Sequence, residues 1–328
     1  MLFLQKRFEL EMDKKKIILT VIVAVTFVAL VFLSAYFYIK SERNARQIPI
    51  VITENERKIY SPPIPDSLNF CGEKVPLEDF DVHERIDREF LVNTYWHSAM
   101  LLYIKRANRW FPLIEQILKK NGIPDDFKYM AVAESGLTNT VSPEGATGFW
   151  QLMEPAAKKY GLEINKEIDE RYNVTKSTQA ACDYLKEAHE MFGTWTLTAA
   201  SYNNGTNGIE NQIGRQQTKN YYNMYLNEET YRFVARIVTL KEIFKNPHQY
   251  GFYVSENELY PRFDTYEVKV NYPVKDFAQF AKNYDINYKI LKIFNPWLRD
   301  NYLSNKNRKT YILEIPDKGE IKIEPDTR

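Results

Sequence analysis

A single glutamate, Glu134, lies on the side of a predicted helix that should face the protein core. Phe127, Met130, Ala131 and Glu134 occupy positions i, i+3, i+4 and i+7, which share one face of a helix that begins near Asp125. Burial disfavours the charged form of a carboxyl group and raises its pKa. A carboxyl group that stays protonated near neutral pH can donate a proton to a substrate. Glu134 is therefore the first candidate for general acid chemistry.

No second acid in the sequence is an obvious partner for this residue, although enzymes that cleave glycosidic bonds commonly use two. Glu144 lies in a loop between a proline and a glycine, where we expect it to be solvated. Asp169 and Glu170 precede an arginine and should form a surface or interhelical ion pair. Glu229 opens a later helix, where a carboxylate suits the helix dipole. If Glu134 is catalytic, it must act first as acid and then as base; a core glutamate bonded to backbone or tyrosine groups is the alternative.

Several helices are predicted around this residue. Apolar residues at helical spacing run from about residue 81 to Gly122, and Pro112 is expected to begin a second helix within that stretch. The same spacing predicts further helices over residues 174–192, 196–202 and 229–245. Residues 40–80 are polar and contain prolines, which predicts a linker.

The pattern changes after residue 262. "TYEVKV" and "TYILEIP" alternate like strands, and two short helical patterns lie between them. The predicted fold is mainly α, with a small βααβ module over residues 262–317.

Five segments resemble, in order, the motifs of the lytic transglycosylases with a goose-type lysozyme-like (SLT) domain. They are "GIPDDFKYMAVAESGL", "SPEGATGFWQLMEPAAKKYGL", "DERYNVTKSTQAACDYL", "LTAASYNNGTNGI" and "LNEETYRFVARIVTLKEIFKNPHQYGF". The resemblance covers about residues 85–255 and implies a catalytic domain over residues 81–255.

The resemblance also implies roles for individual residues. Glu134 matches the single catalytic acid and base of the family, and Glu229 matches a supporting glutamate. Five residues match positions that bind the substrate or line its site: Ser142, Gln151, Met153, Tyr202 and Asn203. Met153 and Tyr202 are the expected hydrophobic wall around Glu134. The chain departs from the family pattern at Phe149, Ser201 and Phe233, and the phenylalanine at 233 lacks the usual tyrosine hydroxyl.

The implied reaction explains why one acid could suffice. Glu134 would protonate the oxygen of the β-1,4 bond between N-acetylmuramic acid and N-acetylglucosamine, and would then take the proton of the C6 hydroxyl as that oxygen attacks. The product would be a 1,6-anhydromuramoyl end, formed without a cofactor or a metal. A lysozyme-type hydrolase that uses water and an inactive peptidoglycan-binding scaffold are the alternatives.

The C-terminal module resembles a degenerate LysM domain, a βααβ unit that binds glycans containing N-acetylglucosamine. The usual Gly-Asp-Thr-Leu after the first strand is replaced by residues 271–274, "NYPV", whereas Asn295 matches an asparagine of the family. Packing without glycan binding is the alternative role for this module.

The N-terminus predicts a membrane anchor. Residues 17–39 contain no charge, and their 23-residue length exceeds the roughly 20 residues that cross a bilayer core. Three lysines, Lys14, Lys15 and Lys16, precede them and favour a cytoplasmic segment over residues 1–16. The prediction is a single-pass protein of the cytoplasmic membrane with its catalytic domain on the periplasmic side, and a cleaved signal peptide is the alternative.

The composition narrows the expected partners. The net charge of +1 over 328 residues gives no indication of nucleic-acid binding. The expected partners are peptidoglycan glycan strands and the membrane, and the sequence identifies no protein partner. Cys71 and Cys182 have no metal-binding spacing. Cys182 fits a buried free thiol, with one disulfide as the alternative.

Overall fold

The computed structural model describes residues 29–38 and 59–321, and the chain divides into two units, residues 1–60 and 61–328. Residues 29–38 are helical and exposed. The predicted cytoplasmic segment and most of the predicted span over residues 17–39 lie outside the described residues. Within the described ranges, no helix combines the length and the apolar character that crossing a membrane requires.

A linker was predicted over residues 40–80, and the part of it that the structure describes, from residue 59 onwards, contains a β-hairpin instead. Strands β1 (Leu68–Phe70) and β2 (Glu73–Val75) are antiparallel, and Phe70 pairs with Glu73. The side chains of Leu68, Phe70 and Val75 are buried in the main core. Each strand carries too few apolar residues for alternation to be recognised against a polar, proline-bearing background.

Two long helices follow the hairpin, α2 (Phe80–Tyr95) and α3 (His97–Lys120). The break between them falls at Trp96. Pro112 was expected to begin the second helix, but it lies inside α3. A proline removes one backbone hydrogen bond from a helix. Ile114 and Leu118 are fully buried after it, so core packing holds the helical path through this position.

The remaining elements of the helical domain are helices of varied length. They are η1 (Asp125–Phe127), α4 (Lys128–Ser135), α5 (Glu154–Lys159), η2 (Glu170–Tyr172), α6 (Val174–Phe192), α7 (Trp195–Asn204), α8 (Thr206–Gln216), η3 (Tyr221–Asn223), α9 (Glu228–Lys245), η4 (Pro247–Tyr250) and η5 (Glu256–Glu258). The predicted helices over 174–192, 196–202 and 229–245 correspond to α6, α7 and α9.

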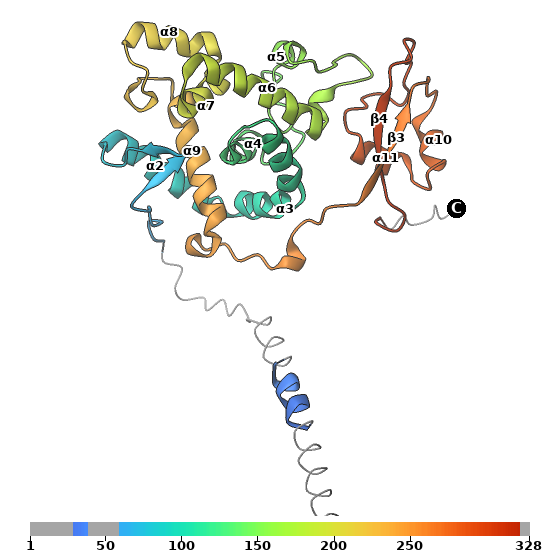
Figure 1. The fold of residues 1–328 in the computed structure, drawn as a ribbon, viewed down its shortest axis with the longest axis horizontal. Helices are drawn as coiled ribbons and strands as arrows, with labels where there is room; N and C mark the ends of the chain where they lie inside the picture. Colours follow the sequence, from blue (N-terminus) through green and yellow to red (C-terminus); the bar gives the residue numbers. More distant parts are fainter. Residues whose placement is uncertain (1–28, 39–58, 322–328) are drawn as a thin grey trace, which may run out of the picture. The chain divides into compact units, whose positions relative to one another are not determined.

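Helix α4 lies at the centre of this domain (Figure 1). It packs against α3 and α9, and the ring around it continues through contacts of α3 with α6, α6 with α7, and α7 with α9. Phe127, Met130 and Ala131 are fully buried, as the helical spacing predicted. Cys71 and Cys182 are both free thiols, and Cys182 is buried.

The C-terminal module is a βααβ unit, as the sequence predicted. Strands β3 (Thr265–Val270) and β4 (Tyr311–Pro316) are antiparallel, and α10 (Phe277–Lys282) and α11 (Tyr288–Phe294) lie between them in sequence. Asn295 is fully buried, and its amide group bonds the backbone of Leu291 and Glu314. This asparagine is therefore engaged within the module.

Candidate active site

The C-terminal end of α4 fixes the position of Glu134. The helix ends at Gly136, which adopts a left-handed conformation with φ of 59°. A Cβ atom at Gly136 would lie 2.3 Å from Cε1 of Tyr103, so only glycine allows this close approach to α3. Ser135 donates a hydrogen bond of 2.9 Å to the carbonyl oxygen of Phe149. These contacts hold the turn that follows Glu134 against α3 and the next loop.

The surroundings of Glu134 favour its neutral form. Burial, the largest cause, and the nearby Glu229 carboxylate both raise the pKa of its carboxyl group, the Arg236 guanidinium lowers it, and the net value is about 8. Among the described residues, none donates a hydrogen bond to this carboxyl group or forms an ion pair with it. The alternative of a core glutamate bonded to tyrosine or backbone groups therefore has no support in this structure. A pKa of about 8 favours the protonated form of Glu134 at neutral pH, and this form can donate a proton.

Tyr202 on α7 lies close enough to Glu134 for the charge of the carboxylate to affect the pKa of its phenol group. Burial raises the pKa of Tyr202 well above its usual value, and the charge of Glu134 raises it further. The Tyr202 hydroxyl donates a 2.6 Å hydrogen bond to the carbonyl oxygen of Trp150. Tyr202 is therefore a neutral, oriented neighbour of the acid.

Asn203 and Glu229 link α7 to the first turn of α9. The amide nitrogen of Asn203 lies 3.1 Å from Oε1 of Glu229, and the hydroxyl of Thr230 donates to the amide oxygen of Asn203 at 2.7 Å. Asn227 caps α9 by accepting a hydrogen bond from the backbone nitrogen of Thr230. Glu229 is the acid whose charge acts on Glu134.

Ser142 and Gln151 both serve the loop between α4 and α5. The Ser142 hydroxyl accepts hydrogen bonds of 3.2 Å from the backbone nitrogens of Glu144 and Ala146. The Gln151 amide donates to the carbonyl oxygens of Thr140 and Gly148, at 3.1 and 2.8 Å. Both predicted substrate-binding groups therefore also shape the loop.

Met153, the other residue expected in the wall, is the N-cap residue that precedes α5, and it is 44% exposed. Its side chain has no contact with Glu134 recorded in the described part of the chain. Phe233, where the family usually has tyrosine, is buried on α9.

A buried ion pair also stabilises the loop between α4 and α5. Arg171 donates to both carboxylate oxygens of Asp169, at 3.0 and 2.8 Å, and its other nitrogen bonds the carbonyl oxygens of Gly145 and Leu152. Asp169 and Arg171 are each only 8% exposed, so this pair is not on the surface. Glu170 is also buried and pairs with Lys176. These acids have structural partners, and Glu134 is not one of them.

Two charged residues near the site were not singled out in the sequence, Arg236 and Glu89. Arg236 follows Glu229 by seven residues, which places both on one face of α9. That spacing was the available signal for Arg236. Glu89 is on α2, and only the packing of α2 against α9 brings it near Arg236. The residues that the structure describes contain no group of three or more histidine, cysteine or acidic side chains that could hold a metal ion.

Comparison with known proteins gives the class of both modules. The family model described as the transglycosylase SLT domain matches residues 112–225, and the model described as the soluble lytic transglycosylase C-terminal LysM-like domain matches residues 266–319. Residues 112–225, which include Glu134, are therefore similar to the SLT domain, and residues 266–319 are similar to the LysM-like domain.

Homology extends beyond these two domains. Membrane-bound lytic murein transglycosylase D of Escherichia coli strain K12 is 26% identical to this chain over 246 residues, which is 71% of the chain and 52% of the relative. The protein of the same name from Escherichia coli O6:H1 gives the same values. The chain spans about half the length of these curated relatives.

Proposed function

We propose that this chain is a peptidoglycan lytic transglycosylase of lysozyme-like fold. The observation that carries the proposal is the carboxyl group of Glu134, which has no hydrogen-bonding partner among the described residues and whose burial raises its pKa. The SLT domain around it and the homology to two lytic murein transglycosylases support the same conclusion. The substrate class is the glycan strand of peptidoglycan.

The proposed mechanism uses Glu134 twice. Its proton passes to the oxygen of the bond between N-acetylmuramic acid and N-acetylglucosamine, and that bond breaks with an oxocarbenium-like anomeric carbon. The substrate's own N-acetyl group helps to stabilise this centre. The Glu134 carboxylate then accepts the proton of the C6 hydroxyl as its oxygen bonds the anomeric carbon. A 1,6-anhydromuramoyl end results, and Glu134 returns to its acid form.

The neighbouring residues would orient the sugar and protect the acid. Tyr202 is proposed as the wall beside the carboxyl group, and Ser142, Gln151, Met153 and Asn203 as contacts to the glycan. Glu229 is proposed as a supporting residue, because its charge helps to keep Glu134 protonated. The LysM-like module is proposed to bind the same glycan strands.

Product analysis tests this function. Purified full-length protein in detergent is incubated with murein sacculi, and the released fragments are examined by mass spectrometry. Anhydro ends are expected. Reducing ends in their place would identify a hydrolase that uses water, and binding to sacculi without release of fragments would identify a scaffold.

We also propose that residues 17–39 anchor the protein in the cytoplasmic membrane, with the catalytic domain on the periplasmic side. The uncharged 23-residue segment and the three lysines before it support this orientation. Alkaline extraction of membranes is the test. An anchored protein stays in the pellet, whereas release into the supernatant would contradict the anchor.

A further inference from the structure

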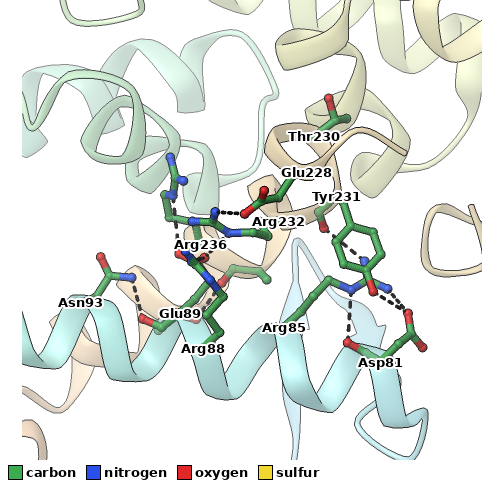
Figure 2. Close-up of polar contacts among 12 residues, drawn as sticks. Asp81, Arg85, Arg88, Glu89, Asn93, Glu228, Thr230, Tyr231, Arg232 and Arg236 are labelled. Atoms are coloured by element: carbon green, nitrogen blue, oxygen red, sulfur yellow. Dashed lines mark hydrogen bonds and ion pairs between the residues drawn. The ribbon is translucent and has the colours of Figure 1, made fainter. Parts of the chain in front are cut away.

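A buried carboxylate on α2 gathers three arginines at its interface with α9 (Figure 2). Glu89 is 1% exposed, and its Oε1 atom lies 2.7 Å from nitrogens of both Arg88 and Arg232. Its Oε2 atom lies 3.5 Å from Nε of Arg236. A buried charge must be paired to be tolerated, and this one is paired three times.

The cluster carries more positive than negative charge. Three guanidinium groups meet Glu89, and one further carboxylate, that of Glu228, binds Arg232 at 2.9 Å. Arg236 has the weakest contact, a single approach at 3.5 Å, and its side chain is 29% exposed. No hydrogen bond from Arg236 to any of the described residues accompanies that approach. Its charge is therefore the least neutralised in the cluster.

Helix α9, which carries Arg236, packs against the helix of the candidate acid. Glu229 and Arg236 are two turns apart on one face of α9, and α9 packs against α4, which carries Glu134 near its end. The two side chains act on Glu134 with opposite sign. One negative and one positive charge on the same helix therefore act on the carboxyl group of Glu134.

We propose that Glu89 is a positioning residue that holds Arg236 where its charge acts on the Glu134 carboxyl group, so that the α2–α9 ion pairs are part of the working site. This inference rests on the proposed role of Glu134. Glu89 touches no reacting atom; it acts through Arg236. When Glu134 has given its proton away, the nearby guanidinium stabilises the carboxylate that must then act as base.

Other charged or titratable groups lie around Glu134 and Arg236. The test must separate their effect on the pKa of Glu134 from the effect of Glu89. These groups are Tyr103 and Arg106 of α3, Tyr202 of α7, and Glu229 and Arg232 of α9. Arg106 is engaged by the carbonyl oxygen of Gly136 at 3.0 Å. Tyr103 and Tyr202 remain neutral in the working range, because burial raises the pKa of both phenols.

The test is the pH dependence of kcat/KM for full-length variants acting on murein sacculi. Glu134 must be protonated in the free enzyme, so kcat/KM falls as the pH rises past its pKa. Removing the charge in Arg236→Gln should move this falling limb to higher pH by roughly 0.5–1 unit. Arg236→Lys keeps the charge and should leave the limb close to that of the unmodified protein.

Glu89→Gln gives the sharpest result, because two explanations predict opposite signs. If Glu89 acts only through its own negative charge, its loss lowers the pKa of Glu134 and moves the limb to lower pH. If Glu89 holds Arg236 in place, its loss releases the guanidinium and moves the limb to higher pH, as in Arg236→Gln. The double variant should then show the same limb as either single variant, since the two changes remove one effect.

Arg88→Gln is the matched control. Arg88 contacts the same carboxylate at 2.7 Å but is 45% exposed and lies on α2, so its loss should leave the limb in place. If Glu89→Gln does not fold, Glu89→Asp keeps the charge, withdraws it by one methylene group and gives the same readout.

If the falling limb of kcat/KM in the Glu89 variant stays in place or moves to lower pH, the proposal is overturned. Activity that survives Glu134→Gln would instead remove the proposed function itself, so the two failures are distinguishable.

Discussion

The hydroxyl group of Tyr202 donates a 2.6 Å hydrogen bond to the carbonyl oxygen of Trp150, so α7 is connected to the loop between α4, which carries Glu134, and α5. Trp150 is fully buried, and its indole nitrogen donates to the hydroxyl of Thr178 on α6 at 2.8 Å. One residue thus anchors this loop to two helices. The loop holds Ser142 and Gln151, so its position matters for the proposed site.

Tyr202→Phe should weaken both the fold and the reaction. The carbonyl oxygen of Trp150 loses its side-chain donor, which costs about 1–2 kcal/mol of unfolding free energy. Chemical denaturation and the rate of sacculus digestion measure the two effects. Tyr184→Phe is the control, because that hydroxyl on α6 also donates to a backbone carbonyl oxygen, that of Ser201 on α7, at 2.5 Å. Equal losses of activity in both variants would show that Tyr202 has only a structural role.

Glu134→Gln should abolish turnover while leaving the protein folded. The amide cannot donate an acidic proton, and general acid–base catalysis is worth roughly 10²–10⁴-fold. The release of soluble fragments measures turnover, and circular dichroism confirms the fold. Retained binding to sacculi would show that the substrate site is intact. Turnover close to that of the unmodified protein would eliminate Glu134 as the acid.

The same variant should be more stable than the unmodified protein at high pH. The folded-state pKa of Glu134, about 8, exceeds the ordinary value of 4.5, so the folded state binds a proton that the unfolded state releases between these values. The unmodified protein therefore loses stability as the pH rises from about 4.5 to about 8, and Glu134→Gln does not. The expected gain at pH 9 is on the order of 1–4 kcal/mol. Thermal unfolding at pH 5 and pH 9 tests this; a difference that does not grow with pH would contradict the raised pKa.

Glu229→Gln should move the falling limb of kcat/KM to lower pH. Its charge raises the pKa of Glu134, so its removal lets the acid lose its proton earlier. The amide oxygen of glutamine can still accept the hydrogen bond from Asn203. Glu228→Gln makes the same charge change one residue away and should leave the limb nearly in place. A limb that moves equally in both variants would indicate a general charge effect.

Gly148→Ala should disrupt the loop more than Gly145→Ala. Both glycines have positive φ, 83° and 87°, but a Cβ atom at Gly148 would lie 2.1 Å from the carbonyl oxygen of Arg171, whereas at Gly145 it meets no atom within 4 Å. Backbone strain alone costs about 1 kcal/mol at either position. We expect a loss of roughly 3 kcal/mol or more at Gly148, where the backbone must also shift. Similar unfolding free energies for the two variants would show that the loop yields freely there.

Local sequence patterns were sufficient to predict most of the helices and the βααβ module. The apolar spacing of Phe127, Met130 and Ala131 specified the buried face of α4, because a helix repeats every 3.6 residues wherever it is placed. The same argument located Glu134 on that face. It failed for Pro112, where burial of the following turns outweighs the local preference of proline, and for Phe70, whose strand is too short to show a pattern.

The electrostatics of the site depend on contacts between residues far apart in the sequence. That Glu134 could be buried was visible in its spacing; that its carboxyl group has no partner among the described residues, and that Glu229 and Arg236 act on it with opposite sign, depends on the packing of α4 against α9. Glu89 meets Arg236 only because α2 packs on α9. The sequence alone determined which residue is the candidate acid, because helical periodicity is local. Tertiary structure decided what surrounds it, because burial and charge act through space between segments that no local pattern connects.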